Sequence, residues 1–312
     1  MNQEFNYKKI NDYVEGFVTQ IGLNLFDLGE INIVKVVQHG LVDAFINKKR
    51  LPPNKLWGKP YFLYAAWQQR KHRVSKTHNY PIGPNLVIDE NPRFTEHKGK
   101  VFPTVFHQLL QSQESIYLYD YKLAEKVVGL DKKLTASLDF DSTRSQCISR
   151  GLKAASSGLF YRDIQKLRKR LKLSDKIQEK VFNCIDYWLE IFFLDFVFYS
   201  HLFKALDCKN VYIICHYHNE GLIAAARKLS VKVIELQHGL ISKGDLYYAY
   251  DDWIKPVAEK ALFQDELWVY GQYWKDLIIQ KGSELKENQI IVKGYYHFTP
   301  DIEEEVDRLR EK

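Results

Sequence analysis

The sequence predicts an α/β protein with a doubly wound parallel sheet of the Rossmann-like type, joined to a second, less regular α/β region. Two observations carry this prediction. Strand-like runs rich in β-branched residues alternate with helical segments through the second half of the chain, and strand, helix and strand within about 30 residues form a right-handed βαβ unit. The composition, with 46% apolar and 14% aromatic residues over 312 positions, also supplies a sizeable core.

The elements of the second half follow from this alternation in chain order. A short buried strand precedes the polar loop "CHYHNEG", and the next helix carries alanines where close packing against a sheet favours small side chains. Two further strands follow, separated by a helix that ends at a glycine. The predicted strands are Val211–Ile214, Val231–Gln237, Asp265–Gly271 and Asn288–Gly294, and the predicted helices are Glu220–Ser230 and Gln272–Gly282.

The first half contains an echo of this pattern. The run "INIVKVVQHG" (Ile31–Gly40) predicts a strand that ends in Gln-His-Gly, the tripeptide that also follows the strand-like "VIEL" in the second half. Candidate elements at Lys59–Gln68 and at Asn79–Ile88, the latter broken at Gly83, continue the echo. A duplicated α/β unit explains the repeat better than coincidence. The expected regions are 1–125 (α/β, with the first Gln-His-Gly), 126–298 (mostly helical over 136–180, then the Rossmann-like lobe) and 299–312 (crossover or tail).

The most apolar part of the chain is "YWLEIFFLDFVFYSHLFKAL" (Tyr187–Leu206). Four polar or charged residues, Glu190, Asp195, His201 and Lys204, interrupt it, whereas a membrane-spanning helix needs about 20 mostly apolar residues. Its apolar residues recur at helical spacing. We therefore expect a buried amphipathic helix, with partial burial at a membrane surface as the alternative.

Two Gln-His-Gly turns are the strongest candidates for chemistry, because ligands of open parallel sheets bind at the carboxyl ends of the strands. Gly239 would permit a tight turn and a close approach of ligand. His238 would then lie at the rim with a side chain that exchanges a proton near neutral pH, and Gln237 would offer a neutral donor and acceptor. His39 holds the equivalent place in the first half. Spacing alone leaves open a purely structural role, in which the tripeptide ends a strand and the histidine bonds to a neighbouring loop.

His216 and His218 lie two residues apart, with Glu220 close by. Zinc would need a third or fourth ligand in tetrahedral geometry, and no local partner completes the set. We therefore expect no metal here, and expect this loop to line the same cleft as His238.

Other charged motifs favour structural roles. "DFD" (Asp139–Asp141) could hold a divalent ion on a nucleotide diphosphate, but it opens a polar segment typical of a helix cap. The basic runs Arg70–Arg73 and Lys166–Lys172 are typical of solvated helix faces, with contact to phosphate or acidic lipid as the alternative. The sequence has no G-x-G-x-x-G, Walker-type or G-x-S-x-G motif, which argues against the usual dehydrogenase, P-loop and hydrolase classes.

Charge and cysteine content indicate the setting. The net charge of +6 suits an anionic small molecule or membrane face but is too small to indicate nucleic-acid binding. The four cysteines show no C-x-x-C spacing, which is typical of reduced thiols in a cytosol. The N-terminal "MNQEFNYKKI" has no apolar core of a signal peptide. We expect a cytoplasmic protein that can contact the inner face of the cytoplasmic membrane.

The residues of the second half resemble a known family. "AAARKLSVKVIELQHGLISKGDLYYAY", then "DELWVYGQYWKDLI", then "IIVKGYYHF" is similar to the first lobe of bacterial surface-polysaccharide glycosyltransferases of the capsule or O-antigen type, with GT-B architecture. In that family a small-residue helix and a strand lead into Glu-Leu-Gln-His-Gly. A tyrosine-bearing loop, a strand ending in glycine and a strand into the lobe crossover then follow. The resemblance covers about Val211–Phe298.

The resemblance implies transfer of a sugar from a nucleotide-sugar donor to a surface-polysaccharide or lipid-linked acceptor, with the nucleotide sugar as co-substrate and no further cofactor. If the transfer is inverting, one ionisable side chain must take the proton of the acceptor hydroxyl, and we assign this role to His238. The residues expected to bind substrate are Gln237, Gly239, His216, His218, Lys243, Tyr247, Tyr248 and His39.

Two other classes of function stay open. The chain could be a non-catalytic carbohydrate-binding or assembly subunit built on a degenerate or truncated GT-B lobe, or a zinc hydrolase that uses His216 and His218. The sequence stops at Lys312, shortly after Gly294, where a nucleotide-binding lobe would begin in the family. A truncated chain, two lobes formed by the two halves, and a degenerate relative are all compatible with this.

Overall fold

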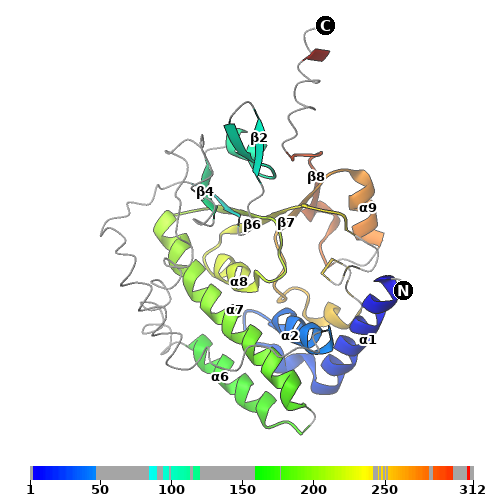
Figure 1. Ribbon diagram of the computed structural model, residues 1–312. Helices are drawn as coiled ribbons and strands as arrows, with labels where there is room; N and C mark the ends of the chain where they lie inside the picture. The colour runs from blue at the N-terminus through cyan, green and yellow to red at the C-terminus, as the bar shows by residue number, and fades with distance from the viewer. Residues whose placement is uncertain are drawn as a thin grey trace.

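Strands from both halves of the chain pair into one six-stranded sheet, with helices packed alongside it (Figure 1). The computed structural model describes residues 3–46, 84–89, 94–97, 100–112, 115–119, 159–175, 177–241, 245, 247–248, 250, 252–280, 284–297 and 308–309. The sheet strands are β1 (Asn85–Asp89), β4 (Ser115–Tyr119), β5 (Asn210–Ile213), β6 (Lys232–Leu236), β7 (Glu266–Val269) and β8 (Ile290–Val292). The longer helices are α1 (Gln3–Ile21), α2 (Val34–Ile46), α6 (Leu159–Lys172), α7 (Glu179–Leu206), α8 (Glu220–Lys228) and α9 (Gln272–Gln280).

The predicted parallel α/β fold is confirmed. All five strand pairings in the sheet are parallel, and the four strands predicted in the second half are present with ends shifted by one or two residues. α8 and α9 occupy the predicted helical segments between strands. The β-branched and apolar residues of "KVIEL" in β6 are buried after the first position, as expected of a central strand covered on both faces.

The strand order contains one reversal of direction. The sheet runs β4-β1-β5-β6-β7-β8, so the chain moves from β1 to β4 on one side and then returns past β1 to β5 on the other. Between β1 and β4, a two-stranded antiparallel ribbon of β2 (Phe94–His97) and β3 (Lys100–Pro103) leads into the short helix α4 (His107–Ser112). The reversal places the topological switch point of the sheet between β1 and β5, which is where doubly wound proteins bind ligands.

The two faces of the sheet bury different layers. Val211 and Val233 face the main core, which α2, α7 and α8 complete, whereas Tyr212 and Ile234 pack with Phe106 on the opposite face. This alternation follows from the two-residue period of a strand. Along β6 it places Glu235 on the same face as Val233. A carboxylate therefore lies in the helix-covered layer, where an apolar residue would ordinarily pack.

The most apolar segment forms α7, the long helix that crosses beneath the sheet in Figure 1. It is a buried helix, as predicted. α8 packs tightly on it, because a Cβ on Gly221 would lie 2.6 Å from the carbonyl oxygen of Phe192 and from the Cβ of Asp195. In the part of the chain that the structure describes, no helix combines the length and the apolar character needed to cross a bilayer.

The predicted strand at the first Gln-His-Gly is wrong. Residues 34–46 form α2, and Gln38, His39 and Gly40 lie in the middle of this helix. The glycine serves helix packing and makes no turn: a Cβ on Gly40 would lie 2.6 Å from the Cα of Ile185 in α7. The run is buried on nearly every side, so its apolar pattern has no clear period, and short apolar runs of this kind fit a buried helix or a buried strand equally well.

The duplicated α/β unit is therefore also wrong, because only the second copy of the tripeptide follows a strand. The strand that includes part of Asn79–Ile88 begins at Asn85. The predicted element at Lys59–Gln68, the basic run Arg70–Arg73 and the Asp139–Asp141 motif lie outside the described residues. The basic run Lys166–Lys172 lies in α6, as a helix face.

Candidate functional site

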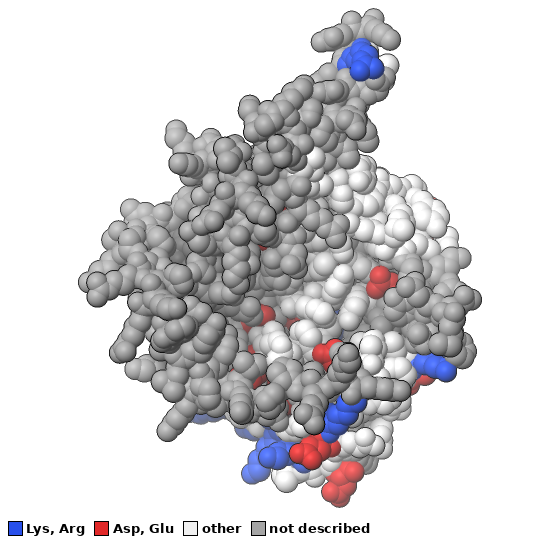
Figure 2. Space-filling model, viewed as in Figure 1, with Lys and Arg blue, Asp and Glu red and all other residues white. Residues whose placement is uncertain are grey.

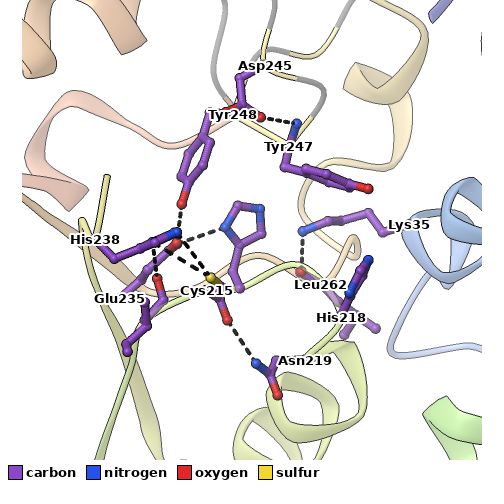
Figure 3. A network of polar contacts seen from close by, with 12 residues as sticks. Lys35, Cys215, His218, Asn219, Glu235, His238, Asp245, Tyr247, Tyr248 and Leu262 are labelled. Carbon is purple, nitrogen blue, oxygen red and sulfur yellow. Dashed lines mark hydrogen bonds and ion pairs between the residues drawn. The ribbon is translucent and has the colours of Figure 1, made fainter. Parts of the chain in front are cut away.

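Two loops meet at the carboxyl edge of the sheet, one after β5 and one after β6 (Figure 3). The loop after β5 carries Cys215, His216 and His218 and leads into α8. The loop after β6 begins with Gln237 and His238. Because β5 and β6 are neighbouring parallel strands, their carboxyl ends lie at the same edge, one strand away from the switch point.

His238 is half-buried and has a defined orientation. Its Nδ1 lies 3.0 Å from the carbonyl oxygen of Ile214. A carbonyl oxygen can only accept, so Nδ1 carries the proton and the neutral ring keeps its lone pair on Nε2. The sulfur of Cys215 lies 3.7 Å from Nδ1 and 3.6 Å from Nε2. Because these distances are nearly equal, the sulfur does not lie along the lone-pair direction of Nε2.

Gln237 and Gly239 differ in what they leave for a ligand. The Gln237 amide is used by the protein, since its nitrogen donates to the carbonyl of Gly239 at 2.9 Å and its oxygen accepts from the backbone N–H of Tyr270 at 3.0 Å. Gly239 does not have a positive φ, so the backbone there does not require glycine. A Cβ on Gly239 would meet no described residue within 4 Å. The structure thus gives Gln237 a role in joining the loop to β7 and leaves open space at Gly239.

His216 belongs to a buried three-residue network behind this edge. Its Nδ1 lies 2.8 Å from Glu235, and the Tyr248 hydroxyl donates to the other oxygen of the same carboxylate. The side chains of His216 and Glu235 are 1% and 0% exposed. Burial, followed by the charge of Lys35, lowers the pKa of His216 in spite of Glu235, and burial raises the pKa of Tyr248. Among the residues that the structure describes, Nε2 of His216 has no hydrogen-bond partner.

A second carboxylate–histidine pair lies beside the first and comes from the other half of the chain. Nε2 of His39 in α2 lies 2.7 Å from Glu220 at the start of α8. Burial raises the pKa of Glu220, but the charge and hydrogen bond of His39, with help from Lys35, outweigh this and hold that pKa at about 2. Nδ1 of His39 has no hydrogen-bond partner within the described part of the chain.

Lys35 is a fully buried cation associated with both pairs. Its Nζ donates to the carbonyl of Leu262 at 2.8 Å and lies 4.1 Å from the centre of the Phe263 ring. Burial lowers the pKa of Lys35 to about 8, although the carboxylates of Glu220 and Glu235 oppose the shift. The charge of Lys35 thus adds to the stabilisation that each buried carboxylate already receives from its hydrogen-bond partners.

An aromatic cluster covers the outer side of the His39–Glu220 pair. The His218 ring lies 4.4 Å from the His39 ring and 4.6 Å from the Trp188 ring, and Tyr247 approaches His39 at 5.5 Å. Tyr217 stacks on Tyr247 at 4.4 Å. The ring of His218 is packed against these side chains, and its backbone has a φ of 67°, a left-handed conformation that costs energy in a residue with a side chain. Burial lowers the pKa of His218 to about 4, so this ring is neutral near pH 7.

The geometry does not support a metal centre built on His216 and His218. Among the residues that the structure describes, no group of three His, Cys, Asp or Glu side chains is arranged to hold a metal ion. His216 is buried with the cation Lys35 acting on it, and His218 turns instead toward His39 and Trp188. The zinc-hydrolase alternative therefore has no support in the described part of the chain.

The comparisons with known proteins give no relative. No protein-family model, no curated protein and no solved structure matches this chain. The site must be interpreted from its own geometry.

The structure brings together most of the residues predicted for the site. His238, His216, His218, Tyr247 and Tyr248 lie near the ends of β5 and β6, and Lys243 lies outside the described residues. His39 also joins this region, but through a helix and not through a second strand-end turn. Sequence reasoning missed Glu235, Lys35 and Trp188. The charged residue inside "VIELQ" was the available signal for Glu235; the other two depend on helix packing that no local pattern reveals.

Proposed function

We propose that this chain is a glycosyltransferase-like protein that transfers a sugar from a nucleotide-sugar donor to a surface-polysaccharide or lipid-linked acceptor. The family resemblance of Val211–Phe298 suggests the reaction, and the site at the carboxyl edge of the sheet supplies a residue that could perform the proton transfer. His238 acts as the general base.

The orientation of His238 is the observation that carries the proposal. A general base must hold its lone pair on an accessible nitrogen in the state that predominates near neutral pH. The hydrogen bond from Nδ1 to the Ile214 carbonyl fixes the tautomer with the lone pair on Nε2. The ring is half-buried, and open space adjoins it at Gly239. An acceptor hydroxyl next to Nε2 would meet a positioned base.

The chemical step then follows. Nε2 of His238 takes the proton of the acceptor hydroxyl while the hydroxyl oxygen attacks the anomeric carbon of the donor sugar. The new C–O bond forms as the bond from the anomeric carbon to the nucleotide phosphate breaks, and the electron pair leaves with the phosphate. Attack and departure on opposite faces of the sugar give inversion. Positioned base catalysis of this kind contributes about 10²–10⁴ in rate.

The donor is tested first, with a thermal-shift screen of the purified chain against nucleoside mono- and diphosphates and their sugar conjugates. A ligand that binds only the native state stabilises it by mass action and so raises the melting temperature. At a ligand concentration 100 times Kd, the gain in the free energy of unfolding is about 2.7 kcal/mol. A rise with one base and its sugar conjugate supports the proposal and names the donor. No rise with any nucleotide at millimolar concentration contradicts it.

The base is tested with His238→Ala, assayed for sugar transfer with the donor so identified. We expect turnover to fall by about 10²–10⁴ while donor binding persists. His201→Ala is the matched control, because His201 is an exposed histidine on α7. Unchanged turnover in His238→Ala would remove its assignment as the base. A large loss of melting temperature in the same variant would indicate that the hydrogen bond to Ile214 is its main role.

The non-catalytic alternative also has an observation in its favour. Trp188, Tyr217 and Tyr247 form a partly exposed aromatic cluster, and aromatic faces with polar neighbours are suited to binding sugars without chemistry. Saturable binding of a glycan with no turnover, in the presence of a nucleotide sugar that also binds, would favour this alternative.

A further inference from the structure

The helix α6 presents a cationic outer face. Its apolar residues Ile164, Leu167 and Leu171 are buried at helical spacing against α7. On the opposite side, Arg162, Lys166, Lys169, Arg170 and Lys172 are all exposed. Residues 159–175 contain six cations and two carboxylates, so this short segment contributes most of the net charge of +6 carried by the whole chain.

The cations of this face are largely uncompensated. Lys166 pairs with Asp163 at 3.0 Å, but the two side chains are 67% and 37% exposed. Ion pairs at such exposed positions are weak, because water screens the attraction between the charges. Arg168 points inward and bonds to Asp186 of α7. Within the described part of the chain, the remaining four cations form no ion pair. In Figure 2, Lys and Arg atoms gather along the lower edge, where α6 lies in Figure 1, with some acidic atoms next to them.

Exposed apolar side chains lie at the same end of the molecule. Leu173, directly after α6, is 70% exposed. Phe45 and Ile46, at the end of α2, are 41% and 55% exposed. The end of α2 lies beside the first turn of α7, because Lys180 donates to the carbonyl of Ala44 at 3.2 Å. The α6–α7 turn and the end of α2 therefore adjoin one another.

We propose that this surface, formed by the outer face of α6 with Leu173, docks onto an anionic lipid bilayer. A cluster of four to eight Lys or Arg residues on an amphipathic helix is attracted to acidic lipid headgroups. Each cation near the membrane surface raises the partition coefficient for the membrane by about fivefold. Exposed apolar side chains beside the cations favour a bilayer over a nucleic acid, because they can enter the region between headgroups and acyl chains. α6 lies on the far side of α7 from α8, so docking there leaves the loops after β5 and β6 uncovered (Figure 1).

The proposal is tested with the full chain and sedimented vesicles, either phosphatidylcholine alone or phosphatidylcholine with about a third phosphatidylserine. The wild type should bind the anionic vesicles and not the neutral ones, and should be released as salt rises from about 0.1 to 0.5 M, since salt screens exposed charges. The quadruple variant Lys166→Gln, Lys169→Gln, Arg170→Gln and Lys172→Gln should bind on the order of 10²–10³ less tightly. Leu173→Ser should weaken binding without changing its salt dependence.

A matched control removes four exposed lysines elsewhere: Lys8→Gln, Lys204→Gln, Lys209→Gln and Lys286→Gln. It carries the same net charge as the first quadruple variant and should still bind the anionic vesicles clearly better than that variant. Equal losses in the two variants would overturn the proposal, as would wild-type binding to a short DNA duplex with none to vesicles. The outcome is separate from the proposed function, because nucleotide-induced thermal shifts should be the same in both variants and the wild type.

Discussion

Gly40→Ala tests whether the first Gln-His-Gly is a helix-packing element. The new Cβ would lie 2.6 Å from Cα and 2.7 Å from the backbone nitrogen of Ile185, and 3.0 Å from the backbone carbon of Cys184. All three atoms belong to the α7 backbone, so none can swing away as a side chain would. α2 must therefore move off α7 and strain the hydrogen bond from Trp188 to Asp43, which is 2.7 Å long.

The magnitude follows from two opposed effects. Alanine is favoured over glycine in a helix interior by about 1 kcal/mol. Overpacking a close-packed core costs about 1–3 kcal/mol, and contact with an immovable backbone belongs at the upper end of that range. We expect a net loss of about 1–2 kcal/mol in the free energy of unfolding, measured by urea denaturation with far-UV circular dichroism.

Gly16→Ala provides the control. Gly16 lies inside α1 and is exposed, and a Cβ there would have no atom of the described residues within 4 Å. The same substitution there should stabilise the protein by about 0.5–1 kcal/mol, the opposite sign. If Gly40→Ala were as stable as the wild type or more stable, the close approach of α2 to α7 would be refuted, and with it the structural role of this glycine.

Two further predictions concern buried ionisable groups. Tyr248→Phe deletes the hydroxyl that donates to the buried carboxylate of Glu235, and should lower the free energy of unfolding by about 1–3 kcal/mol. Tyr295→Phe is the control: this residue is 54% exposed, and its variant should change the free energy of unfolding by less than about 0.5 kcal/mol. Equal effects of the two substitutions would count against the buried network. Burial raises the pKa of Glu190 from 4.5 to about 8, with Arg168 opposing the shift, so this carboxyl contributes stability below about pH 4.5 that is lost as pH rises through about 8. Glu190→Gln should therefore gain melting temperature relative to the wild type between these pH values, with little further gain above; a difference independent of pH would contradict the assignment.

The sequence by itself determined the second half of the fold. β5, β6, β7 and β8 were predictable because each is a short run of β-branched or aromatic residues bounded by polar residues or glycine, and the helices between them have a clear period. Parallel pairing then followed from chain connectivity, since a crossover helix brings the next strand back in the same direction. The placement of His238 at a strand end follows from the same local reasoning.

Only the tertiary structure decided the conformation and the contacts of residues 34–46 in the first half. "VKVVQHGLVDAF" has the residues of a buried strand, yet it is buried on nearly every side between other helices, so the propensity of its valines for strands did not determine its structure. His39 meets Glu220 across 181 positions in sequence because α2 and α8 both pack on α7, and the absent side chains of Gly40 and Gly221 permit those approaches. Such contacts depend on how whole surfaces fit together. A pattern within one segment does not contain that information, because it records only which residues are apolar and how often they recur.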